Sequence, residues 1–143
     1  MKAMNFGRIA AAAVVAWIVS IGLGYLANNV LLADLYQANA AAYRSVEEMT
    51  SKLPIGFCVQ LIGFFAFAYA YAKGYEGGNG IAEGVRFGLL IAVMLVSFAI
   101  VWNYVVQPIS ASLAFAQVGD YLIEGAIYGT IVGVIYKPYG MPA

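Results

Sequence analysis

Histidine is missing from this 143-residue chain, and Cys58 is its single cysteine. Without histidine the chain cannot build a Ser-His-Asp triad, a histidine-ligated haem site or a histidine-based metal site. One cysteine excludes an internal disulfide. No pairing of a nucleophile with a base stands out among the remaining residues, so the sequence predicts no catalytic residue, no metal and no other cofactor.

Charged residues are scarce as well. They make up 10% of the chain, against about 25% in a typical soluble domain. Seven Lys and Arg balance seven Asp and Glu, so the chain lacks the basic excess that binding to nucleic acid requires. Hydrophobic residues account for 64%, which excludes a disordered chain. This composition predicts an integral membrane protein whose surface contacts membrane lipids.

Four stretches are long and apolar enough to cross the hydrocarbon core of a membrane, which takes about 20 helical residues. Pro54 is expected in the first turn of the second stretch, where proline removes no helical hydrogen bond. We therefore predict an all-α fold, a four-helix transmembrane bundle in which residues 1–143 form a single polytopic domain. The predicted spans are residues 9–32, 53–72, 85–106 and 118–136.

The longest loop, residues 33–52, joins the first two spans. Its apolar residues recur at helical spacing, which predicts an amphipathic helix on the outer membrane surface. The alternative is a lid packed over the bundle itself.

Basic residues favour the cytoplasmic side of a membrane. Two of the seven, Arg44 and Lys52, lie on the side opposite the termini. We therefore expect both termini in the cytoplasm of a bacterial cell, with the bundle in its inner membrane. The five basic residues on the side of the termini are Lys2, Arg8, Lys73, Arg86 and Lys137.

Small residues recur four positions apart on three of the spans. Inside lipid, helices associate through such residues because they let two backbones approach closely. The predicted helix-packing positions are Gly125, Gly129 and Gly133 on the fourth span, Ala12, Ala16, Ser20 and Gly24 on the first, and Gly84 and Gly88 on the third.

Glu124 places a carboxylate within the predicted fourth span, in its outer third. An ionised carboxylate at membrane depth is costly unless it is paired or reached by water. Glu124 is therefore a candidate proton or cation site. The alternative is a structural hydrogen bond to a polar residue of a neighbouring span, and the residues predicted near the same outer side are Gln60, Asn28 and Asn103.

A shift of 64 residues places Gln60 on Glu124 and Lys73 on Lys137. This match is consistent with two helical hairpins in a parallel repeat, as in some transporters. Chance similarity within a biased composition is the equal alternative.

Several short segments resemble one group of proteins. They are residues 31–36 (LLADLY), 71–77 (YAKGYEG), 80–88 (GIAEGVRFG), 125–127 (GAI) and 135–137 (IYK). With its four spans, the chain resembles small bacterial membrane proteins that have the layout of the DUF1761 family. The resemblance covers nearly the whole chain. It implies a four-span fold and no activity, and it carries over no site residue.

Taken together, the residues favour a non-catalytic membrane protein rather than an enzyme. We expect a structural or accessory subunit that packs in a larger membrane complex or in a homo-oligomer. The alternative is a small transporter or channel that uses Glu124 as a proton or cation site. A third hypothesis is a binder of lipid, quinone or pigment that uses the aromatic rings of the second span.

Overall fold

The computed structural model describes residues 4–138, and every regular element in that part of the chain is a helix. Four helical segments in it are long and apolar enough to cross a membrane. The predicted all-α, four-helix bundle is therefore confirmed. Lys2, one of the basic residues used to predict the orientation, lies outside the described residues. The four segments are Phe6–Leu31, Val46–Lys73, Gly80–Val106 and Ala111–Ile135.

Two of the four segments contain a π-helical turn. The first segment consists of α1 (Phe6–Leu26) and the turn Ala27–Leu31. The third consists of α4 (Gly80–Leu95), the turn Val96–Ile100 and α5 (Val101–Val106). Each turn adds a residue to the helical repeat and so changes which side chains face the bundle beyond it. The second and fourth segments are α3 (Val46–Lys73) and α6 (Ala111–Ile135).

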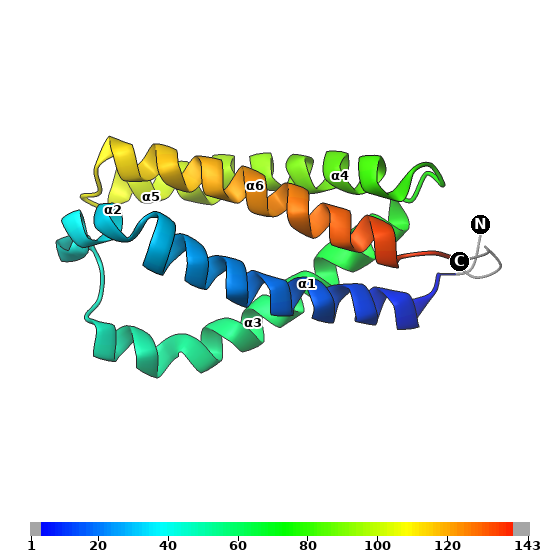
Figure 1. The fold of residues 1–143 in the computed structure, drawn as a ribbon, viewed down its shortest axis with the longest axis horizontal. Helices are drawn as coiled ribbons and strands as arrows, with labels where there is room; N and C mark the ends of the chain where they lie inside the picture. Colours follow the sequence, from blue (N-terminus) through cyan, green and yellow to red (C-terminus); the bar gives the residue numbers. More distant parts are fainter. Residues whose placement is uncertain (1–3, 139–143) are drawn as a thin grey trace.

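The helices α4 and α6 lie side by side, α1 packs across α6, and α3 crosses α1 (Figure 1). We call the end of the bundle where α1 begins and α6 finishes the terminal end. The loop between α1 and α3 lies at the opposite end and contains α2 (Ala33–Ala38) and a 3-10 turn, Ala40–Ala42. We call residues 33–43 the strap, and this end of the bundle the strap end.

The strap contains a much shorter helix than the loop pattern predicts. The side-chain amide of Asn39 donates to the carbonyl of Leu35 at 2.8 Å and so closes off α2 after Ala38. Residues from Val46 onward, which were expected on the membrane surface, belong to α3 instead.

The helix α3 begins seven residues before the predicted second span. Its first residue follows Ser45, whose hydroxyl accepts a hydrogen bond from the backbone N–H of Glu48 at 3.2 Å. Ser-x-x-Glu is the capping-box signature of a helix start. Pro54 therefore lies inside α3, and the prediction that it lies in the first turn was wrong.

The helix α6 also begins seven residues early, at Ala111. Its cap is Ser110, whose hydroxyl accepts from the N–H of Leu113 at 3.3 Å. This start places Glu124 near the middle of α6, and not in the outer third as expected from the sequence.

The apolar core lies in the terminal-end half of the bundle. Its buried residues are Ile9, Ala12, Ala13 and Ala16 of α1, Phe64, Ala68, Tyr71 and Ala72 of α3, and Val132 with Tyr136 at the end of α6. The strap-end half of α3 is different. Among residues 46–63, all but Phe57 and Leu61 are exposed.

Candidate functional site

Glycines form the contact between α4 and α6. The two helices run in opposite directions, and Gly80, Gly84 and Gly88 lie against Gly133, Gly129 and Gly125 in that order. A Cβ added to any of the six would collide with the opposing helix. At Gly125, for example, it would lie 2.8 Å from the carbonyl oxygen of Gly88. The predicted packing glycines of the third and fourth spans therefore face each other inside one chain.

Two details of the small-residue pattern differ from the sequence prediction. Gly80 takes part in the contact, although the predicted span began too late to include it; its spacing of four from Gly84 is the signal. On α1, Ala12, Ala16 and Ser20 are buried. Gly24 makes no packing contact within the described chain, because no atom lies within 4 Å of a Cβ added there.

Glu124 bonds to the hydroxyl of Tyr128, one turn along the same helix. Asp120 lies one turn away in the other direction, close enough for the two carboxylates to repel each other. Tyr121 also lies beside both carboxylates. These side chains form a polar and aromatic face along α6, at spacings of three and four residues. From the sequence we expected a role for Glu124 alone, although the spacing of three and four residues was the signal for the other members of this face.

The predicted partners of Glu124 are not bonded to it. The amide of Asn28 donates to the carbonyl of Gly24 on its own helix at 2.7 Å. Gln60 and Asn103 are exposed, and the side chain of neither has a hydrogen bond within residues 4–138. The interhelical bonds expected from the sequence are therefore replaced by a bond within α6. The reason is the early start of α6, which shifts Glu124 away from the end where Asn28 and Asn103 lie.

Aromatic rings mark the point where α3 and α6 meet. Phe64 contacts Tyr128 edge to face, with 5.0 Å between ring centroids. Both helices run from the strap end to the terminal end, so Gln60 and Glu124 each lie one turn towards the strap end from this contact. Beyond it α3 diverges from α6 (Figure 1). Gln60 and Glu124 are thus the first polar residues on two separating helices.

Gln117 connects this face of α6 to the strap. Its side-chain N–H groups donate to the hydroxyls of Tyr36 at 3.2 Å and Tyr43 at 3.3 Å. The two tyrosine rings lie against each other with centroids 5.6 Å apart. Burial raises the pKa of the Tyr36 hydroxyl above 10.0. The sequence did not predict this contact between the loop tyrosines and Gln117.

At the terminal end, Glu83 of α4 is buried and holds the preceding loop. Its carboxylate accepts from the backbone N–H groups of Glu76 at 2.7 Å and Gly78 at 3.1 Å. Arg86, which lies three residues after Glu83 on α4, forms an exposed ion pair with Glu76 at 3.0 Å. Arg8 donates to the carbonyl of Ile135 at 3.1 Å and so joins α1 to the end of α6. These contacts hold the loop before α4 and the end of α6 in place.

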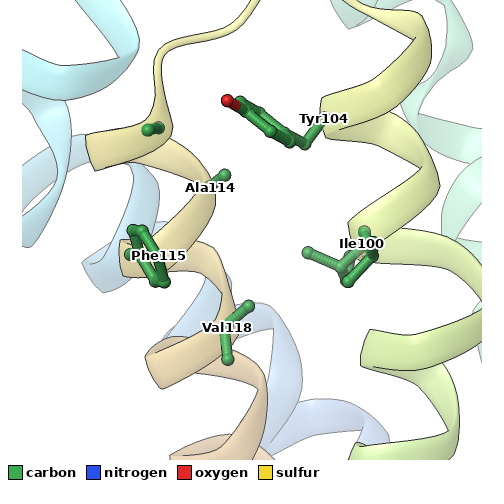
Figure 2. Close-up of a pocket in the computed structure, with 7 residues that line it drawn as sticks. Ile100, Tyr104, Ala114, Phe115 and Val118 are labelled. Atoms are coloured by element: carbon green, nitrogen blue, oxygen red, sulfur yellow. The ribbon is translucent and has the colours of Figure 1, made fainter.

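A groove of about 270 Å³ lies between the strap-end parts of α5 and α6. Ile100 and Tyr104 form one wall, and Ala114, Phe115 and Val118 form the other (Figure 2). Apart from the hydroxyl of Tyr104, these side chains are apolar. The groove therefore has no carboxylate, amine or thiol among its lining side chains.

Within residues 4–138, no group of three or more His, Cys, Asp or Glu side chains is arranged to hold a metal ion. Comparison of the chain with models of known families, with curated proteins and with solved structures finds no match. The resemblance to the DUF1761 layout therefore stays a prediction.

Proposed function

We propose that this chain is a non-catalytic membrane protein that works by packing side by side with other membrane helices, in a homo-oligomer or in a larger membrane complex. The observation that carries the proposal is the environment of Gln60. This carboxamide lies within a membrane-spanning helix, yet it is exposed and has no hydrogen bond in the described part of the chain.

A carboxamide that faces lipid has lost its hydrogen bonds to water without replacement. Polar side chains in spanning helices therefore face other protein or a water-filled space. Hydrogen bonds between helices in a membrane contribute about 0.6–2 kcal/mol each. A neighbouring helix that bonds Gln60 would stabilise the assembled state by that amount.

Two glycines on the same face of α3 fit this role. Gly56 lies four residues before Gln60, and Gly63 lies three residues after it, so all three share one side of the helix. No atom lies within 4 Å of a Cβ added at either glycine. Whereas the six facing glycines of α4 and α6 are used inside the bundle, this second set is free to let another helix approach closely.

The proposed setting is a bacterial inner membrane with both termini in the cytoplasm, since most basic residues lie on that side. The strap then faces the outer aqueous phase. The partners are lipids and either a second copy of this chain or another membrane subunit.

The test compares two glycine substitutions by native mass spectrometry after gentle extraction from the membrane. Gly63→Ile fills the free face of α3, and we expect it to release the chain from its assembly. Gly22→Ile is the matched control, because Gly22 is exposed on α1 and also has no neighbouring atom within 4 Å. An assembly that survives Gly63→Ile, or a wild-type chain recovered only as a monomer, contradicts the proposal.

A second copy is distinguished from another subunit by a cysteine cross-link. Cys58 is exposed, so it is first replaced by Ala, and Gln60→Cys is then oxidised in intact membranes. A disulfide-linked dimer identifies a homo-oligomer. Co-purification of a different protein in fixed ratio without this cross-link identifies a larger complex.

Transport is the second candidate function, and the position of Glu124 favours it. A carboxylate near the middle of a spanning helix, beside Asp120 and at the divergence of α3 from α6, is placed as a proton or cation site would be. We expect Glu124→Gln to abolish proton-coupled flux in reconstituted vesicles. The control is Glu76→Gln, which changes an exposed loop carboxylate. Equal flux in the Glu124→Gln variant and the wild type would remove this candidate.

A further inference from the structure

We propose that the strap is a latch that covers the strap end of the polar face of α6, and that its release opens Asp120 and Glu124 to water. This inference goes beyond lateral assembly, because it concerns access to α6 and involves no residue of the free α3 face.

One set of bonds fastens the strap to the start of α6. Asn39 is 9% exposed, and its amide oxygen accepts from the backbone N–H of Ser110 at 2.7 Å. Its amide nitrogen donates to the Ser110 hydroxyl at 3.2 Å. Ser110 is also the cap of α6, so the strap and the helix start share one hydrogen-bonded unit.

A second set of bonds lies about two turns further along α6, where Gln117 donates to Tyr36 and Tyr43. Asp120 follows Gln117 by three residues, and Glu124 follows it by seven. Both carboxylates therefore lie on the same side of α6 as Gln117. Tyr36 lies near enough to both carboxylates for their charges to raise the pKa of its hydroxyl. The strap therefore lies on α6 between its start and the acidic residues, and with the strap in place Asp120 and Glu124 are half-buried.

The strap is held weakly enough to open. No residue of α2 is fully buried, and the bonds to α6 join neutral groups. The carbonyl oxygen of the Gln117 side chain is buried without a hydrogen-bond partner in the described structure, and opening would hydrate it. Segments with little buried apolar surface open at a small part of the cost of global unfolding.

The experiment measures access to α6 with a membrane-impermeant thiol reagent added on the strap side. Cys58 is replaced by Ala, and Asp120→Cys provides the target. In this background Asn39→Ala removes the first set of bonds, and we expect labelling about tenfold faster, since several hydrogen bonds are lost together. Asn28→Ala is the matched control, because Asn28 also lies near the strap end but bonds only to its own helix.

Equal labelling rates in the parent, Asn39→Ala and Asn28→Ala would overturn the latch. If Asn39→Ala does not fold, the double variant Tyr36→Phe with Tyr43→Phe decides by the same comparison, because it removes the two hydroxyls and keeps the rings. Hydrogen exchange of the strap amides should rise in parallel with labelling. Labelling that rises while strap exchange stays unchanged would also overturn the latch. Loss of assembly on Gly63→Ile changes neither readout, so the two proposals fail independently.

Discussion

Phe64 and Tyr128 are in edge-to-face contact at 5.0 Å, and they are 64 residues apart in the sequence. The same shift relates Gln60 to Glu124 and Lys73 to Lys137. In a parallel repeat with a two-fold axis along the membrane normal, residues on the axis meet their own equivalents. The contact therefore supports the interpretation of two related hairpins, although Tyr139, the equivalent of Tyr75, lies outside the described residues.

The two hairpins, α1 with α3 and α4 with α6, nevertheless pack differently. Glycines hold α4 and α6 together along the spans, whereas α1 and α3 cross and separate (Figure 1). The difference leaves the strap-end half of α3 free, and that half carries the residues on which the proposed assembly depends.

A double-mutant cycle tests the contact at the proposed axis. We expect Phe64→Leu and Tyr128→Leu each to destabilise the bundle, and the coupling energy between them to be about 0.5–1.5 kcal/mol. The bond that Tyr128 makes to Glu124 does not enter the coupling energy, because Tyr128→Leu removes it both in the wild type and in the Phe64→Leu background. The measurement is unfolding in mixed detergent followed by circular dichroism. Simple additivity of the two changes would mean that the rings do not stabilise each other.

The sequence predicted the four spans and their order because runs of about 20 apolar residues have few alternatives to a membrane helix. Helix ends were less accurate, because they depend on caps such as Ser45 and Ser110 rather than on hydropathy. The capping box at Ser45 was available in the sequence. It would have placed Pro54 inside α3.

The polar contacts were the least predictable part. Glu83 has Arg86 within one turn, yet its carboxylate is used by loop amides, since backbone N–H groups must be satisfied when a loop folds back on a helix. The contacts of Asn39 with Ser110 and of Tyr36 with Gln117 join residues more than 70 positions apart. Periodicity within a helix carries no signal for such pairs.

Trp17 links α1 to α3, because its indole N–H donates to the carbonyl of Phe57 at 3.1 Å. We expect Trp17→Phe to lower the free energy of unfolding by about 0.5–1.5 kcal/mol, which is the usual net contribution of one hydrogen bond. Trp102→Phe is the control, since Trp102 is 60% exposed, and it should change stability by less than about 0.5 kcal/mol. Equal effects of the two substitutions would show that the Trp17 bond contributes nothing.

Glu83 is expected to hold the loop before α4 in place. In Glu83→Gln an NH2 group that cannot accept a hydrogen bond replaces one carboxylate oxygen. We expect the free energy of unfolding to fall by about 1–3 kcal/mol. Hydrogen exchange of the Glu76 and Gly78 amides should become faster. Glu76→Gln breaks only the exposed ion pair with Arg86 and should cost at most about 1 kcal/mol. Unchanged exchange in Glu83→Gln would contradict this role.

The glycine contact between α4 and α6 gives the largest expected effect of a single methyl group. In Gly129→Ala the new Cβ meets the backbone carbonyl of Gly84. Because neither backbone can move without separating the helices, we expect the free energy of unfolding to fall by about 1–3 kcal/mol or more. Gly119→Ala on the same helix is the control. It has no atom within 4 Å of its added Cβ, and alanine favours helix over glycine, so stability should hold or rise slightly. Detergent unfolding compares the two variants. A Gly129→Ala protein as stable as Gly119→Ala would mean that α4 and α6 do not approach each other through these glycines.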